Sequence, residues 1–436
     1  MLPFLRFSCF SRTALLLISP ALVSVSAAAA DANYDEANVP EYRLPDPLIT
    51  LKGKTVTSAR QWTRERRPEV LRLFEQNVYG RTPPNPPGFR PGFSTTSVDA
   101  LALNGTAIRK EVTVLFSREA DAPRLRLLIY LPKDAPRPVP VFLGLNFDGN
   151  HTVHSDPGIS LPQIWSKGST GQPGGFVRAS PETRGASASR WQVEKVLSRG
   201  YAVVTAWYGD IEPDFPEGWK QGVRGKLFGA ADKQPRKGDE WGAIGAWAWG
   251  LSRAMDYLEF DKEFDAKRVT VIGHSRLGKT ALWAGAQDER FDAVISNNSG
   301  EGGAALSHRP FGETVKRINT SFPHWFCDNY KKFNDRVEDL PVDQHMLIAL
   351  IAPRPVYVAS ATEDLWADPH GEFLGAKHAE PVYALFGRAG LGVGDMPTPN
   401  EPVGDYVSYH IRTGKHDVTA YDWDQYLNFA RRQFGR

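Results

Sequence analysis

Val269-Thr-Val-Ile-Gly-His-Ser-Arg-Leu-Gly-Lys-Thr280 decides the fold of this 436-residue chain. Its first four residues are apolar or β-branched and predict a short buried strand, which Gly273 ends. Ser275 comes two residues later, and apolar residues from Leu277 onward recur at helical spacing. A serine on a sharp turn between a strand and a helix has the nucleophile-elbow geometry, in which helix N–H groups can stabilise an oxyanion. We therefore predict that Ser275 is a catalytic nucleophile.

The motif differs from the usual G-x-S-x-G elbow. Leu277 occupies the position of the second glycine, and Gly278 follows it. This difference favours a narrower group of enzymes than the generic lipases.

The remaining pattern predicts an α/β fold. Strands and helices alternate after an antiparallel start, which is typical of a mostly parallel sheet covered on both faces. The expected helices are 58–79, 241–260, 346–352 and 423–434, and the expected strands are 108–116, 125–131, 139–145, 202–207, 269–272, 293–296, 356–360 and 407–411. We predict the α/β-hydrolase fold, a three-layer α/β/α sandwich. It forms one domain over residues 31–436, with long loop insertions near 148–190 and 300–340.

The N-terminus has the pattern of a secretory signal peptide over residues 1–30. Arg6 and Arg12 precede an apolar run over residues 13–25. The small alanines at 27–30 are typical of a signal-peptidase cleavage site. We expect cleavage near Ala30 and a bacterial protein that is secreted or periplasmic, with no membrane contact afterwards. Loss of two arginines and no acid takes the formal charge from +2 to 0, which argues against nucleic acid as a partner.

The two cysteines predict a fold without an internal disulfide. Cys9 leaves with the signal peptide, so Cys327 has no second cysteine in the mature chain. About 400 residues can bury a large core on their own, and we expect a monomer.

The α/β-hydrolase order of Ser, acid and His along the chain locates the other triad members. Asp364 follows the strand 356–360, and His416 lies in the loop before the last helix. His416 would act as the general base, and Asp364 would orient its ring. Glu363 is the neighbouring alternative for the acid.

Two cations flank the nucleophile. Arg276 is adjacent to Ser275, and Lys279 lies one helical turn further along. Because unpaired charge is costly in the interior, we expect both side chains at the pocket. They suit a polar, acid-derived substrate, and Arg276 can add positive charge at the oxyanion.

At these residues the chain resembles the glucuronoyl esterases, carbohydrate esterase family 15, whose elbow reads G-C-S-R-x-G-K. The resemblance covers most of the mature chain. It includes the stretches Asn297-Asn-Ser-Gly-Glu-Gly-Gly303, Arg309-Pro-Phe-Gly-Glu-Thr314, His345-Met-Leu-Ile-Ala-Leu-Ile-Ala-Pro-Arg354 and Glu363-Asp-Leu-Trp366.

The resemblance implies cleavage of esters between 4-O-methyl-glucuronic acid on glucuronoxylan and lignin alcohols, without a metal or other cofactor. It implies that Ser275 is the nucleophile, His416 the base and Arg276 an oxyanion stabiliser. It also implies that Lys279, Glu313 and Trp366 contact the hydroxyls and ring of the uronate.

Two positions depart from the fungal members. His274 stands where those carry a disulfide-forming cysteine, and Asn298 stands at their triad acid. An amide cannot serve as a carboxylate, which favours Asp364, as in many bacterial relatives. The long insertions also resemble bacterial members and would deepen the cleft.

Two other functions stay open at this stage. One is another serine hydrolase on the same fold, such as an acetyl-xylan esterase, a feruloyl esterase or a peptidase. The other is a non-catalytic carbohydrate-binding protein that has kept the fold.

The triad acid can be tested by single substitutions. Asp364→Ala is expected to lower kcat by about 10²–10⁴, because the acid orients the base. Glu363→Ala and Asn298→Ala are expected to cost far less. Steady-state kinetics on one ester substrate measure all three, and a silent Asp364→Ala beside a damaging Glu363→Ala would move the acid by one residue.

Overall fold

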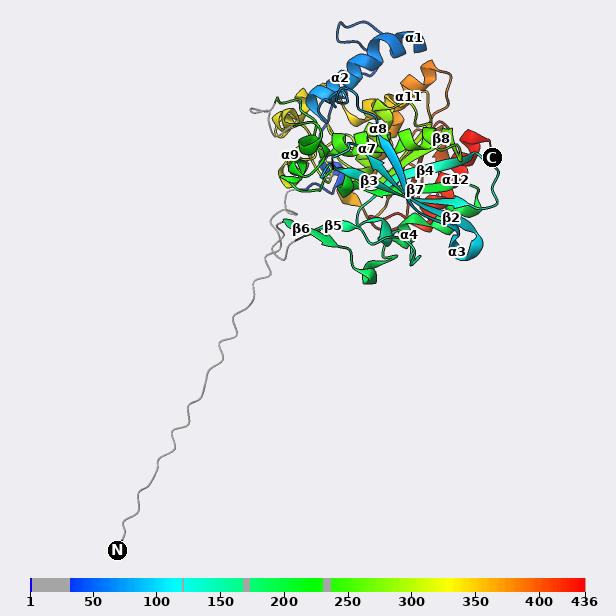
Figure 1. The fold of residues 1–436 in the computed structure, drawn as a ribbon. Coiled ribbons are helices and arrows are strands. Elements are labelled where there is room, and N and C mark those ends of the chain that lie inside the picture. Colours follow the sequence, from blue (N-terminus) through cyan, green and yellow to red (C-terminus); the bar gives the residue numbers. More distant parts are fainter. Residues whose placement is uncertain (2–31, 120, 168–172, 230–236, 436) are drawn as a thin grey trace. The chain divides into compact units, whose positions relative to one another are not determined.

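The strands around the elbow pair into one large sheet (Figure 1). In the computed structural model, which describes Met1 and residues 32–119, 121–167, 173–229 and 237–435, this sheet has ten strands in the order β1-β2-β3-β7-β4-β8-β9-β10-β12-β11. Their bounds are β1 Gly92–Leu101, β2 Ala107–Leu115, β3 Arg124–Pro132, β4 Val139–Asn146, β7 Ala202–Trp207, β8 Phe264–His274, β9 Ala293–Asn297, β10 Val356–Ala361, β11 Val403–Gly404 and β12 Val407–Arg412.

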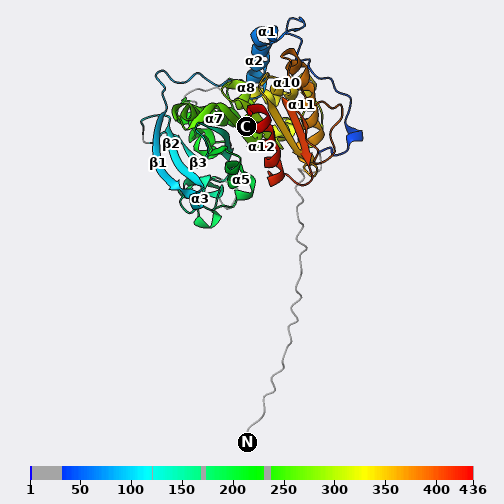
Figure 2. The same cartoon turned by 90° about the vertical axis from the view of Figure 1, so that its right-hand side faces the viewer.

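The sheet is mostly parallel, as the sequence predicts. Strands β7, β4, β8, β9, β10 and β12 run parallel to one another, whereas β1, β2 and β3 pair in antiparallel fashion and β11 pairs antiparallel with β12. Figure 2 shows β1–β3 at one side of the domain and α11 at the other. Parallel strands bring their carboxyl ends to one edge, and the candidate site lies there.

Helices cover both faces of the sheet, because alternate strand residues point to opposite faces. Val141, Val271 and Val358 belong to a core shared with the helices α7 (Ala243–Phe260), α8 (Arg276–Gln287), α10 (Gln344–Ala349) and α11 (Pro369–Leu385). Phe142 and Ile272, their neighbours in sequence, belong to a second core shared with α5 (Val193–Ser198) and α12 (Ala420–Phe434). The three-layer α/β/α sandwich predicted from the sequence is confirmed.

Most expected helices are present. The predicted helix 58–79 is a continuous helical stretch over Ala59–Gln61, Trp62–Arg66 and Arg67–Asn77, the middle part being a π-helix. The other main helices are α5 Val193–Ser198, α7 Ala243–Phe260, α8 Arg276–Gln287, α10 Gln344–Ala349, α11 Pro369–Leu385 and α12 Ala420–Phe434. The sequence pattern does not predict α11, because Pro381 interrupts its interior and glycines break the apolar repeat.

The two long segments expected as insertions carry short elements of their own. Residues 148–190 contain a two-stranded hairpin, β5 Gln163–Lys167 and β6 Pro173–Arg178, which Figure 1 shows below the main sheet, and most of α4 Ala188–Trp191. Residues 300–340 contain α9 Val315–Ser321 and 3₁₀ turns. Asn33–Arg436 cluster as one compact unit. The predicted signal peptide, apart from Met1, lies outside the described residues.

The elbow depends on a glycine that leaves room for a backbone turn. A Cβ atom at Gly273 would lie 1.9 Å from the Leu277 carbonyl oxygen, which belongs to the first turn of α8. Gly278 is also enclosed, since a Cβ atom at this position would lie 3.0 Å from the Ser299 Cβ atom. These contacts explain the glycines at 273 and 278.

Gly273→Ala is expected to lower the free energy of unfolding by about 3 kcal/mol or more, because backbone must move to admit the methyl group. Gly92→Ala is the matched control: it is also a strand glycine, and its Cβ atom would meet only Leu115 side-chain atoms at 3.6–3.7 Å. Chemical denaturation of both variants measures the difference. Equal stability of the two would show that the elbow tolerates a side chain at 273.

Candidate active site

Ser275 lies at the turn between β8 and α8, where the elbow motif predicts it. Its backbone has φ 57° and ψ −129°, a strained conformation for a residue with a side chain. The Ser275 N–H donates to the Asn297 carbonyl at the end of β9 (2.9 Å), which holds the turn against the sheet. Arg276 begins α8, so its N–H is among the helix-terminal amides without an intrahelical acceptor and can stabilise an oxyanion.

Asp364 and His416 meet at the ends of neighbouring strands. The His416 Nδ1 atom lies 2.6 Å from Asp364 Oδ2, so a proton on Nδ1 leaves Nε2 free to act as a base. Asp364 follows β10 and is buried, whereas the adjacent Glu363 is exposed. The pair formed in the structure is therefore the one that the triad order predicts, with Asp364 and not Glu363.

Asn298 supports the acid. Its Nδ2 atom donates to Asp364 Oδ2 (2.8 Å), and its backbone has φ 46°, in the left-handed region that asparagine tolerates. Burial raises the pKa of Asp364, but hydrogen bonds from His416 and Asn298 and the charge of His416 hold it below its ordinary value. The side chain at 364 is thus kept ionised, as a partner of an imidazolium must be.

Backbone hydrogen bonds join the loop of Asp364 to the loop of His416. The Thr362 N–H donates to the Arg412 carbonyl, and the Glu363 N–H donates to the Gly414 carbonyl, both at 2.9 Å. The two loops leave β10 and β12, which are adjacent and parallel. Their relative position is therefore set by the sheet.

Ser275, Arg276 and His416 line one open cleft of about 590 Å³. Its remaining wall is largely aromatic and includes Phe147, Trp165, Trp207, Tyr208 and Phe215. Trp165 comes from β5 and stacks on Phe215, with ring centroids 4.9 Å apart. The cleft is large enough for a sugar-sized substrate.

Arg276 is held in this cleft by an acid that the sequence analysis missed. Its Nη1 atom is paired with Asp214, and its guanidinium lies 4.9 Å from the ring centroid of Trp325. Asp214 also accepts hydrogen bonds from His324 Nε2 and Trp325 Nε1, both at 2.7 Å. The Arg276 Nε atom is itself buried and has no acceptor within the described part of the chain.

Asp214 stays charged despite its burial. Burial raises its pKa, but the hydrogen bond from His324 and the charge of Arg276 bring that pKa well below the ordinary value. No short motif marks Asp214, because it lies 61 residues before Ser275 in an irregular segment. Only the folded chain brings the two together.

Lys279, Glu313 and Trp366 form a separate cluster. Lys279 is buried, and its Nζ donates to the Ser299 carbonyl. Burial lowers the pKa of Lys279, and the charges of Glu313, Glu301 and Glu372 oppose this effect. The Glu313 N–H donates to the Trp366 carbonyl (2.9 Å), and the side chains of these two residues are also hydrogen-bonded. Of the described residues that line the cleft with Ser275, none belongs to this cluster.

The chain is similar to known esterases in sequence and in structure. A sequence model of the family "Glucuronyl esterase, fungi" matches residues 221–387. A carbohydrate esterase from an unknown prokaryotic organism is 54% identical over 91% of each chain. A glucuronoyl esterase structure from Solibacter usitatus is 54% identical, with a TM-score of 0.86 over 92% of this chain and all of that chain.

The chain belongs to carbohydrate esterase family 15. It is a carboxylic ester hydrolase with the α/β-hydrolase fold, as the elbow and the accompanying motifs predict. A glucuronoyl esterase of the same family from Teredinibacter turnerae T7901 is more distant, at 33% identity and a TM-score of 0.77 over 92% of each chain.

A second histidine, His274, lies against His416. The ring of His274 lies 4.4 Å from that of His416, and His274 Nδ1 is hydrogen-bonded to Asn297 Oδ1 at 2.7 Å. Burial, followed by the charge of His416, lowers the pKa of His274 to about 3, so the ring is neutral. His274 therefore supports His416 without adding charge.

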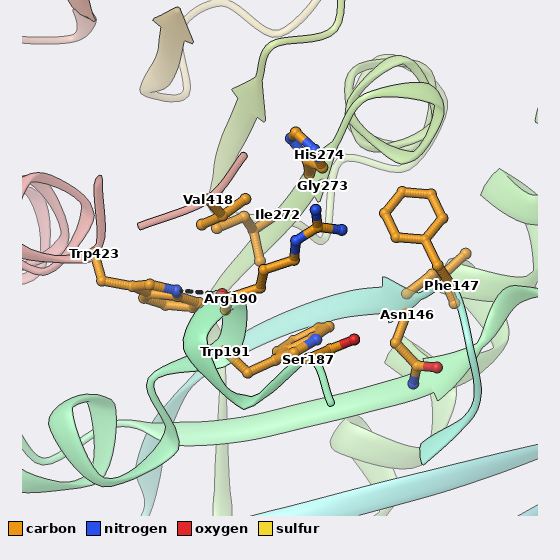
Figure 3. Close-up of a pocket in the computed structure, with 11 residues that line it drawn as sticks. Asn146, Phe147, Ser187, Arg190, Trp191, Ile272, Gly273, His274, Val418 and Trp423 are labelled. Carbon is orange, nitrogen blue, oxygen red and sulfur yellow. Dashed lines mark hydrogen bonds between the residues drawn. The ribbon is translucent and has the colours of Figure 1, made fainter. Parts of the chain in front are cut away.

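His274, Phe147 and Arg190, which line the cleft, also line a smaller, more apolar pocket (Figure 3). Ile272 of β8, Val418 from the loop after His416, and Trp423 of α12 line this second pocket. The dashed line in Figure 3 is the hydrogen bond from Trp423 Nε1 to the Arg190 carbonyl, at 2.7 Å. Through these contacts the loop after His416 is packed onto the core.

The described ranges contain neither a candidate metal site nor a candidate membrane-spanning helix. There, the esterase shows no group of three or more His, Cys, Asp or Glu side chains placed to hold a metal ion. Within the same ranges, no helix combines the length and apolar character needed to cross a membrane.

The Asp214–Arg276 pair can be tested by a double-mutant cycle. Asp214→Asn is expected to lower kcat/KM by roughly 10- to 100-fold for any ester, because Arg276 loses the anchor that holds it near Ser275. If Asp214 acts through Arg276, the Asp214→Asn/Arg276→Ala double variant loses no more than Arg276→Ala alone. Additive losses would assign Asp214 a role independent of the arginine.

Proposed function

We propose that this esterase cleaves ester bonds between 4-O-methyl-glucuronic acid of glucuronoxylan and lignin alcohols. The observation that carries the proposal is the cluster of Lys279, Glu313 and Trp366, which starts one helical turn from the elbow serine. Buried polar groups near the elbow helix favour an acyl group that carries hydroxyls over a lipid chain, which offers them no hydrogen bond.

The relatives support the same substrate class. The Solibacter usitatus relative is called a glucuronoyl esterase. A Cerrena unicolor protein named 4-O-methyl-glucuronoyl methylesterase is 25% identical over 82% of this chain, which spans 65% of that protein. The names belong to those proteins, and here they favour a glucuronate ester over an acetate or ferulate ester.

The mechanism follows from the residues of the cleft. Ser275 Oγ attacks the ester carbonyl while His416 Nε2 takes its proton, and Asp364 stabilises the imidazolium. The backbone N–H of Arg276 and the positive charge of its guanidinium, which lines the cleft beside Ser275, stabilise the oxyanion. His416 then protonates the leaving alcohol, and a water activated by the same histidine releases glucuronate from Ser275.

The uronate would lie between the elbow and the cluster. Lys279 donates to a sugar hydroxyl, Glu313 accepts from one, and Trp366 offers a ring face. Burial raises the pKa of Glu313, and the charges of Lys279 and Arg317 oppose this rise. Opposite charges therefore lie close together in the cluster.

The same proposal extends to the whole protein. Residues 1–30 would be removed as a signal peptide, and residues 31–436 would act as a single monomeric domain that is secreted or periplasmic. The segments 148–190 and 300–340 would extend the cleft, since Trp165 of the first already lines it.

Lys279→Ala tests the substrate class. Loss of the ammonium group is expected to lower kcat/KM for benzyl glucuronate. The loss should correspond to roughly 1–3 kcal/mol of transition-state stabilisation, the scale of a charged hydrogen bond. Aryl acetates lack the sugar hydroxyls and should be hydrolysed about as before. The ratio of the two kcat/KM values is the measurement, because it does not depend on the fraction of folded enzyme.

Two further variants serve as controls for Lys279→Ala. Arg276→Ala is expected to depress hydrolysis of both ester classes, because an oxyanion develops with either. Ser275→Ala sets the background and should abolish turnover with normal thermal unfolding. Parallel losses for Lys279→Ala on both classes would remove the sugar-recognition role, and preference for methyl galacturonate or acetates over glucuronate would overturn the proposed substrate.

A further inference from the structure

Arg412 is a buried cation at the end of β12, four residues before His416. Its side chain is 3% exposed. The guanidinium reaches over the loop that carries the base: Nη2 donates to the carbonyl oxygens of Lys415 (2.8 Å) and Asp417 (2.6 Å). A single side-chain nitrogen thus binds the backbone on both sides of His416.

The other edge of the guanidinium is anchored in the core. Arg412 Nε donates to Asp422 Oδ2 at 2.8 Å, and Asp422 is fully buried in the first turn of α12. Asp422 also accepts from the Thr419 backbone N–H (2.7 Å) and lies 2.9 Å from His410 Nε2. The clamp therefore connects the loop to α12 and β12 through groups that are themselves fixed.

The loop needs such a clamp. The His416 side chain is 42% exposed, and Gly414 two residues before it has φ 120°, where few side chains are tolerated. The base must keep Nδ1 on Asp364 while Nε2 faces Ser275, and a displacement of about 1 Å can cost 100-fold in rate. The other ion pair of the loop, Arg190 with Asp417, is more than a third exposed on both sides and stabilises it little.

We infer that Arg412 is a positioning residue for the general base, acting by holding the backbone at Lys415 and Asp417. The inference rests on the proposed role of His416. The planar fork is essential to it, because one rigid group binds two backbone carbonyls of the loop and the Asp422 carboxylate of α12 at the same time. A lysine keeps the positive charge beside Asp422 and cannot reproduce this arrangement.

The test compares two arginines of the same chemistry. Arg412→Lys is expected to lower kcat on benzyl glucuronate tenfold or more, with KM changed less than about twofold, because binding of the uronate does not involve the loop. Arg354→Lys is the matched control. Like Arg412, Arg354 holds backbone through its guanidinium: it binds the carbonyls of Gly285, Asp288 and Phe291, and it lies at the opposite edge of the sheet, before β10.

Thermal unfolding of both variants separates stability from positioning. Similar losses of stability with a kcat loss confined to Arg412→Lys support the inference. Equal kcat losses in the two variants, or a rise in KM that accounts for the change at Arg412, would overturn it. His416→Ala is measured in parallel, and if it keeps full activity, the proposed function fails before the positioning role is in question.

A second variant perturbs the clamp from the loop side and keeps the buried charge. A Cβ atom at Gly414 would lie 3.0 Å from Arg412 Nη1, so Gly414→Ala presses on the guanidinium. Gly392→Ala is its control: it shares the positive φ, and nothing lies within 4 Å of its Cβ position. A kcat loss of at least fivefold in Gly414→Ala alone is expected, and equal kcat values in the two would contradict the inference even if Arg412→Lys does not fold.

Discussion

The parallel alignment of six strands is the constraint on which the site depends. Carboxyl ends of parallel strands meet at one edge of a sheet, and β8, β9, β10 and β12 end there side by side. Each supplies one part: Ser275 after β8, Asn298 after β9, Asp364 after β10 and His416 after β12. The site is therefore assembled from segments up to 141 residues apart, without any of them having to reach far from its strand.

Around this edge, buried charges are held in networks and not as isolated pairs. Asp214 is paired with Arg276 and accepts hydrogen bonds from His324 and Trp325. Asp422 is hydrogen-bonded to Arg412 and His410. A buried carboxylate with several donors is stabilised in its charged form and fixes the direction of each donor. The first network holds Arg276 in the cleft, and the second holds the loop that carries His416, so both determine geometry as well as stability.

The sequence predicted the architecture well where the pattern is local. The strand 356–360 and the helix 423–434 have clear periodicity and are confirmed as β10 and α12 with small changes at their ends. The elbow was found because its geometry requires a strand, glycine, serine and helix in immediate succession. The helix α11 was missed because Pro381 and the glycines of its first turns obscure its repeat, and packing on α10 overrides that weak preference.

By itself the sequence determined the fold class, the family and the order in which the candidate site residues occur, because these depend on neighbouring residues and on spacing along the chain. Only the tertiary structure decided which carboxylate meets His416, that Asn298 supports it, and that Asp214 and Arg412 hold the side chain and the loop on which the chemistry depends. These contacts join distant segments in the chain. No spacing rule encodes them, since each follows from where separate strands and loops end in space.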